Sequence, residues 1–138
     1  MTRRRVVVTG LGIVCPIGNS VEEAWAGALA GKSGIGRITR FDPSRLSAQI
    51  AGEVKGFDVT QYIPAKEARR MDTFIHYGMA VGIQAWKDSG LAITPENAER
   101  IGINMGSGIG GLPMIEQTHA ELQKNGPRRI SPFFIPST

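Results

Sequence analysis

One stretch decides the fold class of this 138-residue chain: Ile101-Gly102-Ile103-Asn104-Met105-Gly106-Ser107-Gly108-Ile109-Gly110-Gly111-Leu112. A short apolar run is followed by four glycines within six residues, and residues at helical spacing come next. This order predicts a strand that ends in a glycine turn, from which a helix extends to Asn125-Gly126-Pro127. A strand that leads through a short turn into a helix indicates an α/β fold.

The glycines also match the G-x-G-x-x-G pattern of dinucleotide sites at Gly106, Gly108 and Gly111, where helix amides hold a pyrophosphate. Such a site needs an acidic residue on a second strand about 20 residues further on. That distance falls on Asn125-Gly126-Pro127-Arg128-Arg129, which no strand precedes. Glycines equally allow a tight turn beside an apolar ligand or another strand. The packed turn is therefore favoured, and the dinucleotide site stays open as the alternative.

Composition predicts one globular domain with a core, because 41% of the residues are hydrophobic. The single cysteine, Cys15, excludes an internal disulfide framework and a cysteine-based metal cluster. The start, Arg3-Arg4-Arg5-Val6-Val7-Val8, has too few apolar residues for a signal peptide, and no long apolar run follows. We therefore expect a cytoplasmic protein with no membrane partner.

The charge balance suits an acidic partner. The sequence contains sixteen Lys and Arg and twelve Asp and Glu, which gives a net charge of +4 and a pI near 9.6. Nucleic acid is one such partner, but the arginines fall in separate short clusters without interleaved aromatics or a recognisable motif. We therefore expect no nucleic-acid partner, whereas an acidic protein fits the same charges.

The first part of the chain predicts a strand, a helix and a peripheral excursion. Val6-Val7-Val8-Thr9 is β-branched throughout, as in a parallel strand buried on both faces. Ser20-Val21-Glu22-Glu23 is a capping box that starts a helix, and Gly31 ends it. We expect a loop over residues 33–47 and a short peripheral strand over residues 49–54. The residues expected on one apolar face of the helix are Val21, Ala24, Trp25, Ala28 and Leu29.

The middle of the chain predicts two helices. A helix from Pro64 places Lys66, Arg69 and Arg70 on one side as a compact positive patch. The next helix, residues 72–89, is apolar almost all round and must pack deeply against neighbours. Its narrow polar stripe runs through Asp72, His76, Gln84 and Asp88. Thr94-Pro95-Glu96 predicts a further helix start before the strand at Ile101.

No catalytic group can be assembled from the candidates in this sequence. His76 lies on the polar stripe, and His119 lies on the amphipathic helix after the glycines. Cys15 sits in a loop with no histidine at a spacing that would activate it. We therefore predict structural or solvated roles for all three, no catalytic residue and no metal site.

Two features suggest that the chain is cut short. Two parallel strands cannot form an independent parallel sheet. Ser131-Pro132-Phe133-Phe134-Ile135-Pro136 also presents three large apolar residues between prolines, and they need something to pack against.

Taken together, these motifs resemble the N-terminal part of the β-ketoacyl-acyl carrier protein synthases of the thiolase superfamily. The synthase II branch is most similar, and the synthase I branch is the alternative. Each motif is weak alone, but seven occur in register at the spacing of the family. They cover residues 4–12, 16–19, 31–35, 41–42, 70–72, 106–111 and 126–134.

The resemblance implies a thiolase-like α/β/α/β/α arrangement of two similar halves. Residues 1–138 would form most of the first half and stop before the helix that bears the nucleophile. The activity implied is elongation of fatty acyl chains by decarboxylative Claisen condensation, on a cysteine assisted by two histidines that this chain lacks. No cofactor is implied. The chain alone is expected to be inactive and to expose apolar surface.

The resemblance also implies two sets of site residues and two partners. Gly108 and Ile109 would border the acyl pocket, with Ile109 as its gate, while Phe134 and Ile135 would line the other subunit's pocket in a homodimer. The residues matching positions that bind acyl carrier protein are Lys66, Arg69, Arg70, Arg128 and Arg129. A solvated surface is the alternative for these cations. A free-standing, non-catalytic carrier-binding module is the alternative for the chain.

Overall fold

The computed structural model describes residues 3–138, which form two compact units. One unit contains the residues up to Phe57 together with Val81–Ala92. The other contains Asp58–Ala80 and Ile93–Thr138. Met1 and Thr2, at the predicted basic start, lie outside the described residues. The longest helix, α3 (Thr73–Ser89), contributes its first half to the second unit and its second half to the first.

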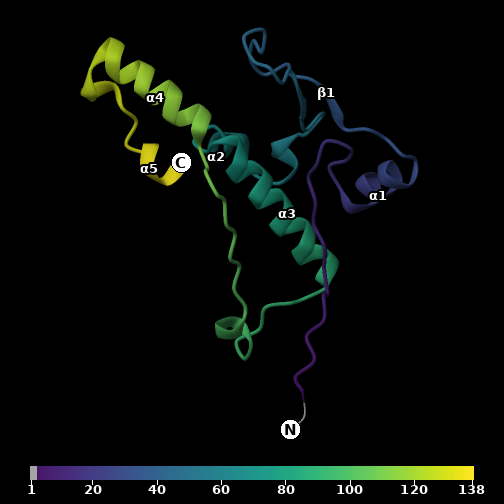
Figure 1. Cartoon of the computed structure of the whole chain (residues 1–138). Helices are drawn as coiled ribbons and strands as arrows, with labels where there is room; N and C mark the ends of the chain where they lie inside the picture. The colour runs from purple at the N-terminus through teal and green to yellow at the C-terminus, as the bar shows by residue number, and fades with distance from the viewer. Residues whose placement is uncertain (1–2) are drawn as a thin grey trace. The chain divides into compact units, whose positions relative to one another are not determined.

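The first helix, α1 (Val21–Leu29), begins at the predicted capping box (Figure 1). The Glu23 amide donates to the Ser20 hydroxyl at 3.2 Å, and the Glu23 carboxylate accepts from the Asn19 amide at 2.8 Å. The capping box is thus confirmed, with the return bond one residue earlier than expected. Gly31 follows the helix with φ of 64°, as the C-terminal glycine prediction requires. The predicted apolar face is only partly covered, because Trp25 is 64% exposed.

A β-hairpin forms around the predicted excursion, most of which is its connecting loop. Strand β1 (Ile35–Arg37) pairs antiparallel with β2 (Ile50–Gly52), with Ile35 opposite Gly52. The short strand predicted within residues 49–54 is therefore confirmed, whereas the loop prediction for residues 33–47 is wrong at β1. The three residues of β1 have a central glycine and no β-branched run, so local sequence did not indicate a strand.

The carboxylate of Glu53 fixes the chain just after β1. It accepts from the Thr39 hydroxyl at 2.7 Å and from the amides of Thr39 and Arg40 at 3.0 and 3.2 Å. These bonds favour the charged form, so they hold the pKa of Glu53 below its ordinary value of 4.5, with the Thr39 hydroxyl as the largest cause. Their stabilisation is present above that ordinary value and is lost as the pH falls through the lowered one.

The polar stripe of α3 has a structural role in the first unit. Asp88 accepts from the Leu11 amide at 2.8 Å, and Gln84 accepts from the Ile13 amide at 3.0 Å. A Cβ atom at Gly12 would overlap the Val81 carbonyl oxygen, so only glycine allows the chain to lie this close to the helix. The stripe therefore binds backbone amides of the segment that precedes α1.

The second unit is helical. Its one-turn elements are η1 (Val59–Gln61), α2 (Ala65–Ala68), η2 (Ala98–Arg100), η3 (Pro127–Arg129) and α5 (Phe134–Ser137). Its longer helices are the first half of α3 and α4 (Leu112–Asn125), as predicted. The helix predicted from Pro64 is confirmed but short, and the start predicted at Thr94 yields only the 3-10 turn η2.

Both predicted parallel strands are wrong as strands in this structure. Val6-Val7-Val8-Thr9 and Ile101-Gly102-Ile103-Asn104-Met105 form no ladder among the described residues. Val6, in the run typical of a strand buried on both faces, is 94% exposed, and Ile103 is 73% exposed. A parallel strand is stabilised by hydrogen bonds to neighbouring strands, and the local pattern that predicts the strand does not supply them.

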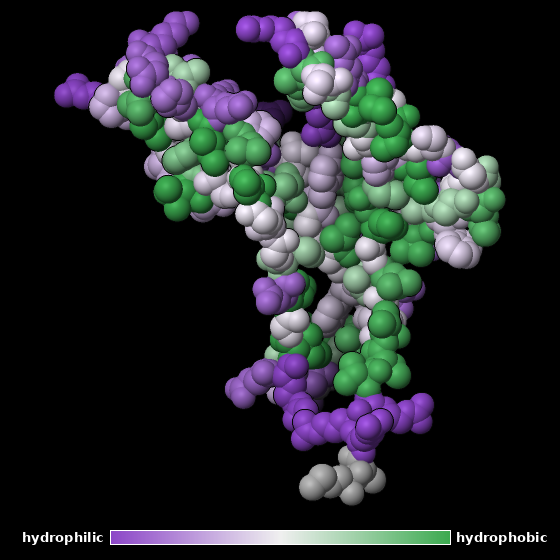
Figure 2. Space-filling model, in the orientation of Figure 1, coloured by the Kyte–Doolittle hydropathy of each residue, from purple (hydrophilic) through white to green (hydrophobic). Residues whose placement is uncertain are grey.

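Large hydrophobic side chains remain open to solvent, as expected for this chain alone. Among the described residues no large side chain is fully buried, and the buried apolar residues are Ala24, Ile63, Ala68 and Ala80. Hydrophobic residues are correspondingly visible on the surface in Figure 2. Within the described part of the chain, no helix combines the length and hydrophobicity needed to cross a membrane.

Candidate functional site

All nine predicted site residues belong to the second unit. They lie on three segments, which are α2 with the turn that follows it, the glycine turn before α4, and the stretch from η3 to α5. The glycine turn and α5 meet the turn after α2 at the junction between α2 and α3, whereas η3 lies beyond the C-terminal end of α4. The candidate site is therefore described from that junction outward.

Asp72 is the residue at that junction. Its side chain is only 7% exposed, and it lies immediately before α3. One carboxylate oxygen accepts from the Thr73 amide at 2.5 Å, and the other accepts from the Met114 amide at 3.0 Å. The first amides of a helix have no acceptor within the helix, and the N-terminal end of the helix dipole favours a negative charge. A single carboxylate therefore caps α3 and α4 together.

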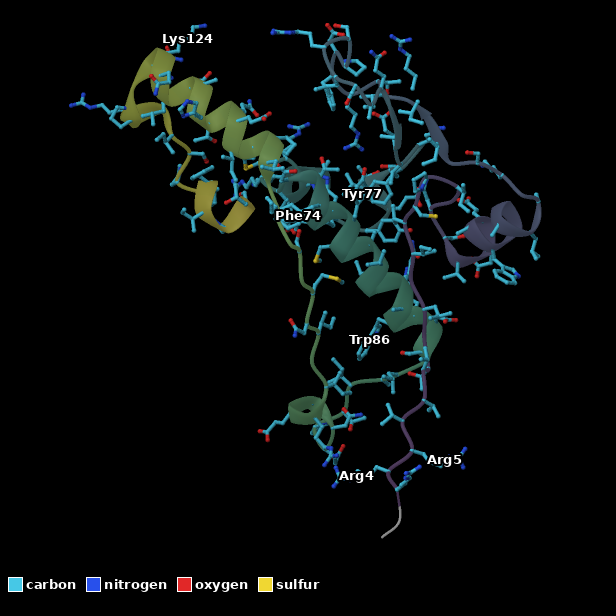
Figure 3. All side chains as sticks on the ribbon, viewed as in Figure 1. Arg4, Arg5, Phe74, Tyr77, Trp86 and Lys124 are labelled. Atoms are coloured by element: carbon cyan, nitrogen blue, oxygen red, sulfur yellow. The ribbon has the colours of Figure 1, made fainter. Side chains whose placement is uncertain are left out.

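The glycine turn packs closely between two segments at its last two residues. A Cβ atom at Gly110 would come within 2.5 Å of the Phe74 ring, which lies near the start of α3 (Figure 3). Gly111 has φ of 67°, and a Cβ atom there would lie 2.7 Å from the Thr138 Cα. The predicted tight turn is thus confirmed at these two positions.

The same geometry weighs against the dinucleotide alternative. The carboxylate of Asp72 already accepts a hydrogen bond from an amide at the start of α4, where a bound pyrophosphate would accept one. A second anion at this position would be repelled by the Asp72 carboxylate. Gly106 and Gly108 have no atom near the position of a Cβ, so no close approach explains the first two glycines of the motif.

Helix α5 is tied to the residues around Asp72. The Ser137 hydroxyl donates to the Arg70 carbonyl oxygen, and the Asp72 amide donates to the Ser137 carbonyl oxygen at 3.3 Å. Ser137 is only 3% exposed, so these are interior hydrogen bonds. The segment that bears Phe134 and Ile135 is thereby held against the start of α3.

The predicted acyl-pocket residues lie on two segments that meet at Gly111 and Thr138. Ile109 is 75% exposed and Ile135 is 79% exposed, whereas Phe134 is half-buried. Two large aliphatic side chains are thus open to a ligand or to another protein surface.

The predicted carrier-binding cations form two groups. Lys66 and Arg69 are exposed at α2, and the Arg70 guanidinium lies 4.5 Å from the centre of the Phe133 ring. Arg128 and Arg129 are exposed in η3, which follows the C-terminal end of α4 beyond Lys124 (Figure 3). Since α4 has 14 residues, its two ends lie about 21 Å apart. The structure therefore separates these cations along a helix.

The overall positive charge is carried by the other unit. The first unit contains nine Lys and Arg against five Asp and Glu, whereas the second contains seven of each kind. The excess of +4 thus lies in the first unit. The predicted carrier-binding cations therefore belong to a unit with no net charge. The net charge of the whole chain did not indicate where these cations lie.

The rejected catalytic candidates have structural surroundings. His76 Nε2 lies 2.8 Å from the Ala68 carbonyl oxygen, which confirms a hydrogen-bonded histidine. His119 is exposed on α4. Cys15 closes a tight turn, because its amide donates to the Gly18 carbonyl oxygen at 2.9 Å. Among the described residues, no group of histidine, cysteine and acidic side chains could hold a metal ion.

Two residues of this site were underestimated from sequence. Asp72 was assigned to the polar stripe of a helix, and Ser137 was not singled out. An aspartate directly before a helical pattern does signal a cap for its own helix. Its bond to an amide 42 residues away has no local signal.

Comparison with known sequences identifies a family over almost the whole chain. The family model described as "Beta-ketoacyl synthase, N-terminal domain" matches residues 3–138. A protein of Vibrio cholerae named 3-oxoacyl-(acyl-carrier-protein) synthase 2 is 57% identical over 138 residues, which are 100% of this chain and 33% of the relative. A protein of the same name from Coxiella burnetii is 52% identical over 136 residues, 99% of this chain and 33% of the relative. The chain thus spans about a third of the length of the curated relatives it matches.

The solved structures that align with this chain are also ketosynthases. The ishigamide ketosynthase/chain length factor aligns with a TM-score of 0.71 at 29% identity, over 97% of this chain and 34% of that chain. A structure of a type II PKS acyl-carrier protein in complex with its ketosynthase, bound to the hexaketide, aligns with a TM-score of 0.72 at 28% identity. The alignment covers 96% of this chain and 35% of that chain. The predicted thiolase-like α/β fold class is therefore confirmed.

Substitution of Gly111 tests the geometry of the glycine turn. We expect Gly111→Ala to lower the free energy of unfolding by about 1–3 kcal/mol, because alanine disfavours positive φ and would crowd Thr138. Gly106→Ala is the matched control, because nothing lies near its Cβ position, and its effect should stay within about 0.5 kcal/mol. Urea unfolding of the two variants measures both values. Equal effects would contradict the assigned turn.

Proposed function

This chain belongs to the beta-ketoacyl synthase family, and on that premise we propose that it forms the first part of a 3-oxoacyl-(acyl-carrier-protein) synthase of the synthase II type. The observation that carries the proposal is the 57% identity that extends over all 138 residues. The complete enzyme would elongate fatty acyl chains with malonyl-acyl carrier protein. The synthase I type and a non-catalytic carrier-binding module are the alternatives.

The proposed reaction needs a nucleophile that this chain does not supply. In a decarboxylative Claisen condensation, a cysteine thiolate first takes the acyl group from the thioester of acyl-acyl carrier protein and expels the carrier's thiolate. Malonyl-acyl carrier protein then loses CO2, and its carbanion attacks the thioester carbon and expels the thiolate. Cys15 closes a turn, and His76 is bonded to the Ala68 carbonyl oxygen. We therefore propose that the chain alone is inactive and that its residues bind and orient substrates.

The acyl chain would be bound by the glycine turn and α5. Ile109 extends an exposed aliphatic side chain between glycines, where it can be displaced without disturbing packed neighbours. Gly108 leaves open space beside it. Covering Ile109 and Ile135 with an acyl chain or with a second subunit would remove apolar surface from water. We propose that Ile109 gates the acyl pocket and that Phe134 and Ile135 line the pocket of the other subunit in a homodimer.

The cations at the two ends of α4 would receive acyl carrier protein. Lys66, Arg69 and Arg70 lie toward one end, and Arg128 and Arg129 lie past the other. An acidic helix of similar length could pair with both groups, and charge complementarity of this kind mainly speeds association. The aligned ketosynthase in complex with an acyl-carrier protein supports this partner. We also propose a cytoplasmic location, where such a soluble carrier would be available.

Charge reversal tests the function and the partner together. In the complete synthase carrying this sequence, Lys66→Glu/Arg69→Glu should lower kcat/KM for malonyl-acyl carrier protein by about 10-fold at low salt, because each reversal replaces an attraction with a repulsion. The salt dependence of kcat/KM should fall as well. These two positions are chosen because Arg70 also contacts Phe133.

Arg37→Glu/Arg45→Glu is the matched control, because it makes a double charge reversal in the other unit. Its kcat/KM should match that of the unaltered synthase. Absence of elongation by the unaltered synthase would refute the proposed function. Equal losses in the two double variants would refute only the assigned carrier surface.

Enlargement of Ile109 tests the gate. Ile109→Phe should reduce acylation by long acyl chains by about 10-fold or more while sparing short chains, because a bulkier side chain fills the space that a long chain needs. Ile93→Phe is the control, since Ile93 is also an exposed isoleucine and lies outside the glycine turn and the stretch before it. Rates of enzyme acylation with short and long acyl-carrier proteins give the comparison. A uniform loss across chain lengths would show that Ile109 is not a gate.

A further inference from the structure

Arg70 is connected to α5 at both ends of that helix. Its guanidinium lies 4.5 Å from the centre of the Phe133 ring, and Phe133 directly precedes the helix. Its carbonyl oxygen accepts from the hydroxyl of Ser137, the last residue of the helix. One residue of the carrier-binding group thus contacts both flanks of the segment that contains Phe134 and Ile135.

The guanidinium can serve two partners at once. Its flat face attracts the negative face of an aromatic ring, while its N–H donors point outward from the edge. Arg70 is exposed, so these donors are accessible to an acidic group. The neighbouring Arg69 is exposed as well, but the cation–π contact found among the described residues belongs to Arg70. The two arginines therefore carry the same charge and differ in their contact with the segment that begins α5.

We propose that Arg70 is a positioning residue that sets the acyl-chain preference of the synthase, because its stack on Phe133 fixes the start of α5. The proposal rests on the proposed function and adds a role to the carrier-binding surface. The Ser137 hydrogen bond uses the backbone of Arg70, so it survives substitution of the side chain. The stack alone depends on the guanidinium and the ring, and it can be removed separately.

The test compares chain-length preference in variants of the complete synthase. Arg70→Lys keeps the positive charge but loses the planar group, and Phe133→Leu keeps an apolar side chain but loses the ring. Each should lower the ratio of kcat/KM for long over short acyl chains by about two- to fivefold, the size expected for an exposed cation–π contact. The double variant should lower the ratio no further, because both changes remove the same contact.

Two controls separate this role from charge and from folding. Arg69→Lys makes the same chemical change away from the Phe133 ring and should leave the ratio unchanged, while Phe133→Tyr keeps a ring and should preserve it. In the chain itself, ring-current shifts of the Arg70 side-chain protons report the stack without any catalysis. These shifts should vanish in Phe133→Leu.

Three results would overturn the proposal. They are an unaltered ratio in Arg70→Lys, equal changes in Arg70→Lys and Arg69→Lys, or additive effects in the double variant. An unaltered synthase without elongation activity would instead refute the proposed function, and the positioning role with it. The ring-current measurement would still show whether the stack exists.

Discussion

A single buried carboxylate, that of Asp72, joins the parts of the second unit. It accepts from amides at the starts of α3 and α4, and the Asp72 amide donates to Ser137 in α5. A helix cap contributes about 0.5–2 kcal/mol, and here one side chain supplies two caps. The close contacts of Gly110 with Phe74 and of Gly111 with Thr138 are made around the same junction. Three segments distant in sequence thus depend on one residue.

This junction connects the two proposed functions of the unit. Arg70 lies two residues before Asp72, and Ile109 lies three residues before the helix that Asp72 caps. Arg70, one of the proposed carrier-binding cations, and the segments proposed to bind the acyl chain are therefore anchored to common hydrogen bonds. A displacement of α5 would alter the contacts of Arg70, because the backbone and the side chain of Arg70 both contact that segment. Because Arg70 contacts the segment that begins α5, docking of the proposed carrier at Arg70 would be linked to the position of the segment proposed to bind the acyl chain.

Local signals predicted the helices well, and they failed where structure depends on distant partners. The capping residues of α1 and the glycine after α4 act within a few residues, so the sequence reveals them. The run from Val6 reads as a buried strand, but no ladder forms there among the described residues. Strand β1 was missed because its pairing with β2 is not encoded in its own three residues. The bond from Asp72 to Met114 is equally non-local. The proposed site residues were found through the family resemblance, since patterns alone showed only glycines, cations and apolar side chains.

Amide hydrogen exchange at Thr73 and Met114 tests the central role of Asp72 most directly. Both amides lie in the first turn of a helix, where no acceptor within the helix protects them, so their protection reports the cap itself. Asp72→Ala should abolish protection at both amides together, whereas Asp58→Ala, which removes the cap of η1, should leave both protected. Loss of protection at Thr73 with unchanged protection at Met114 would show that Asp72 caps only its own helix and would contradict the account.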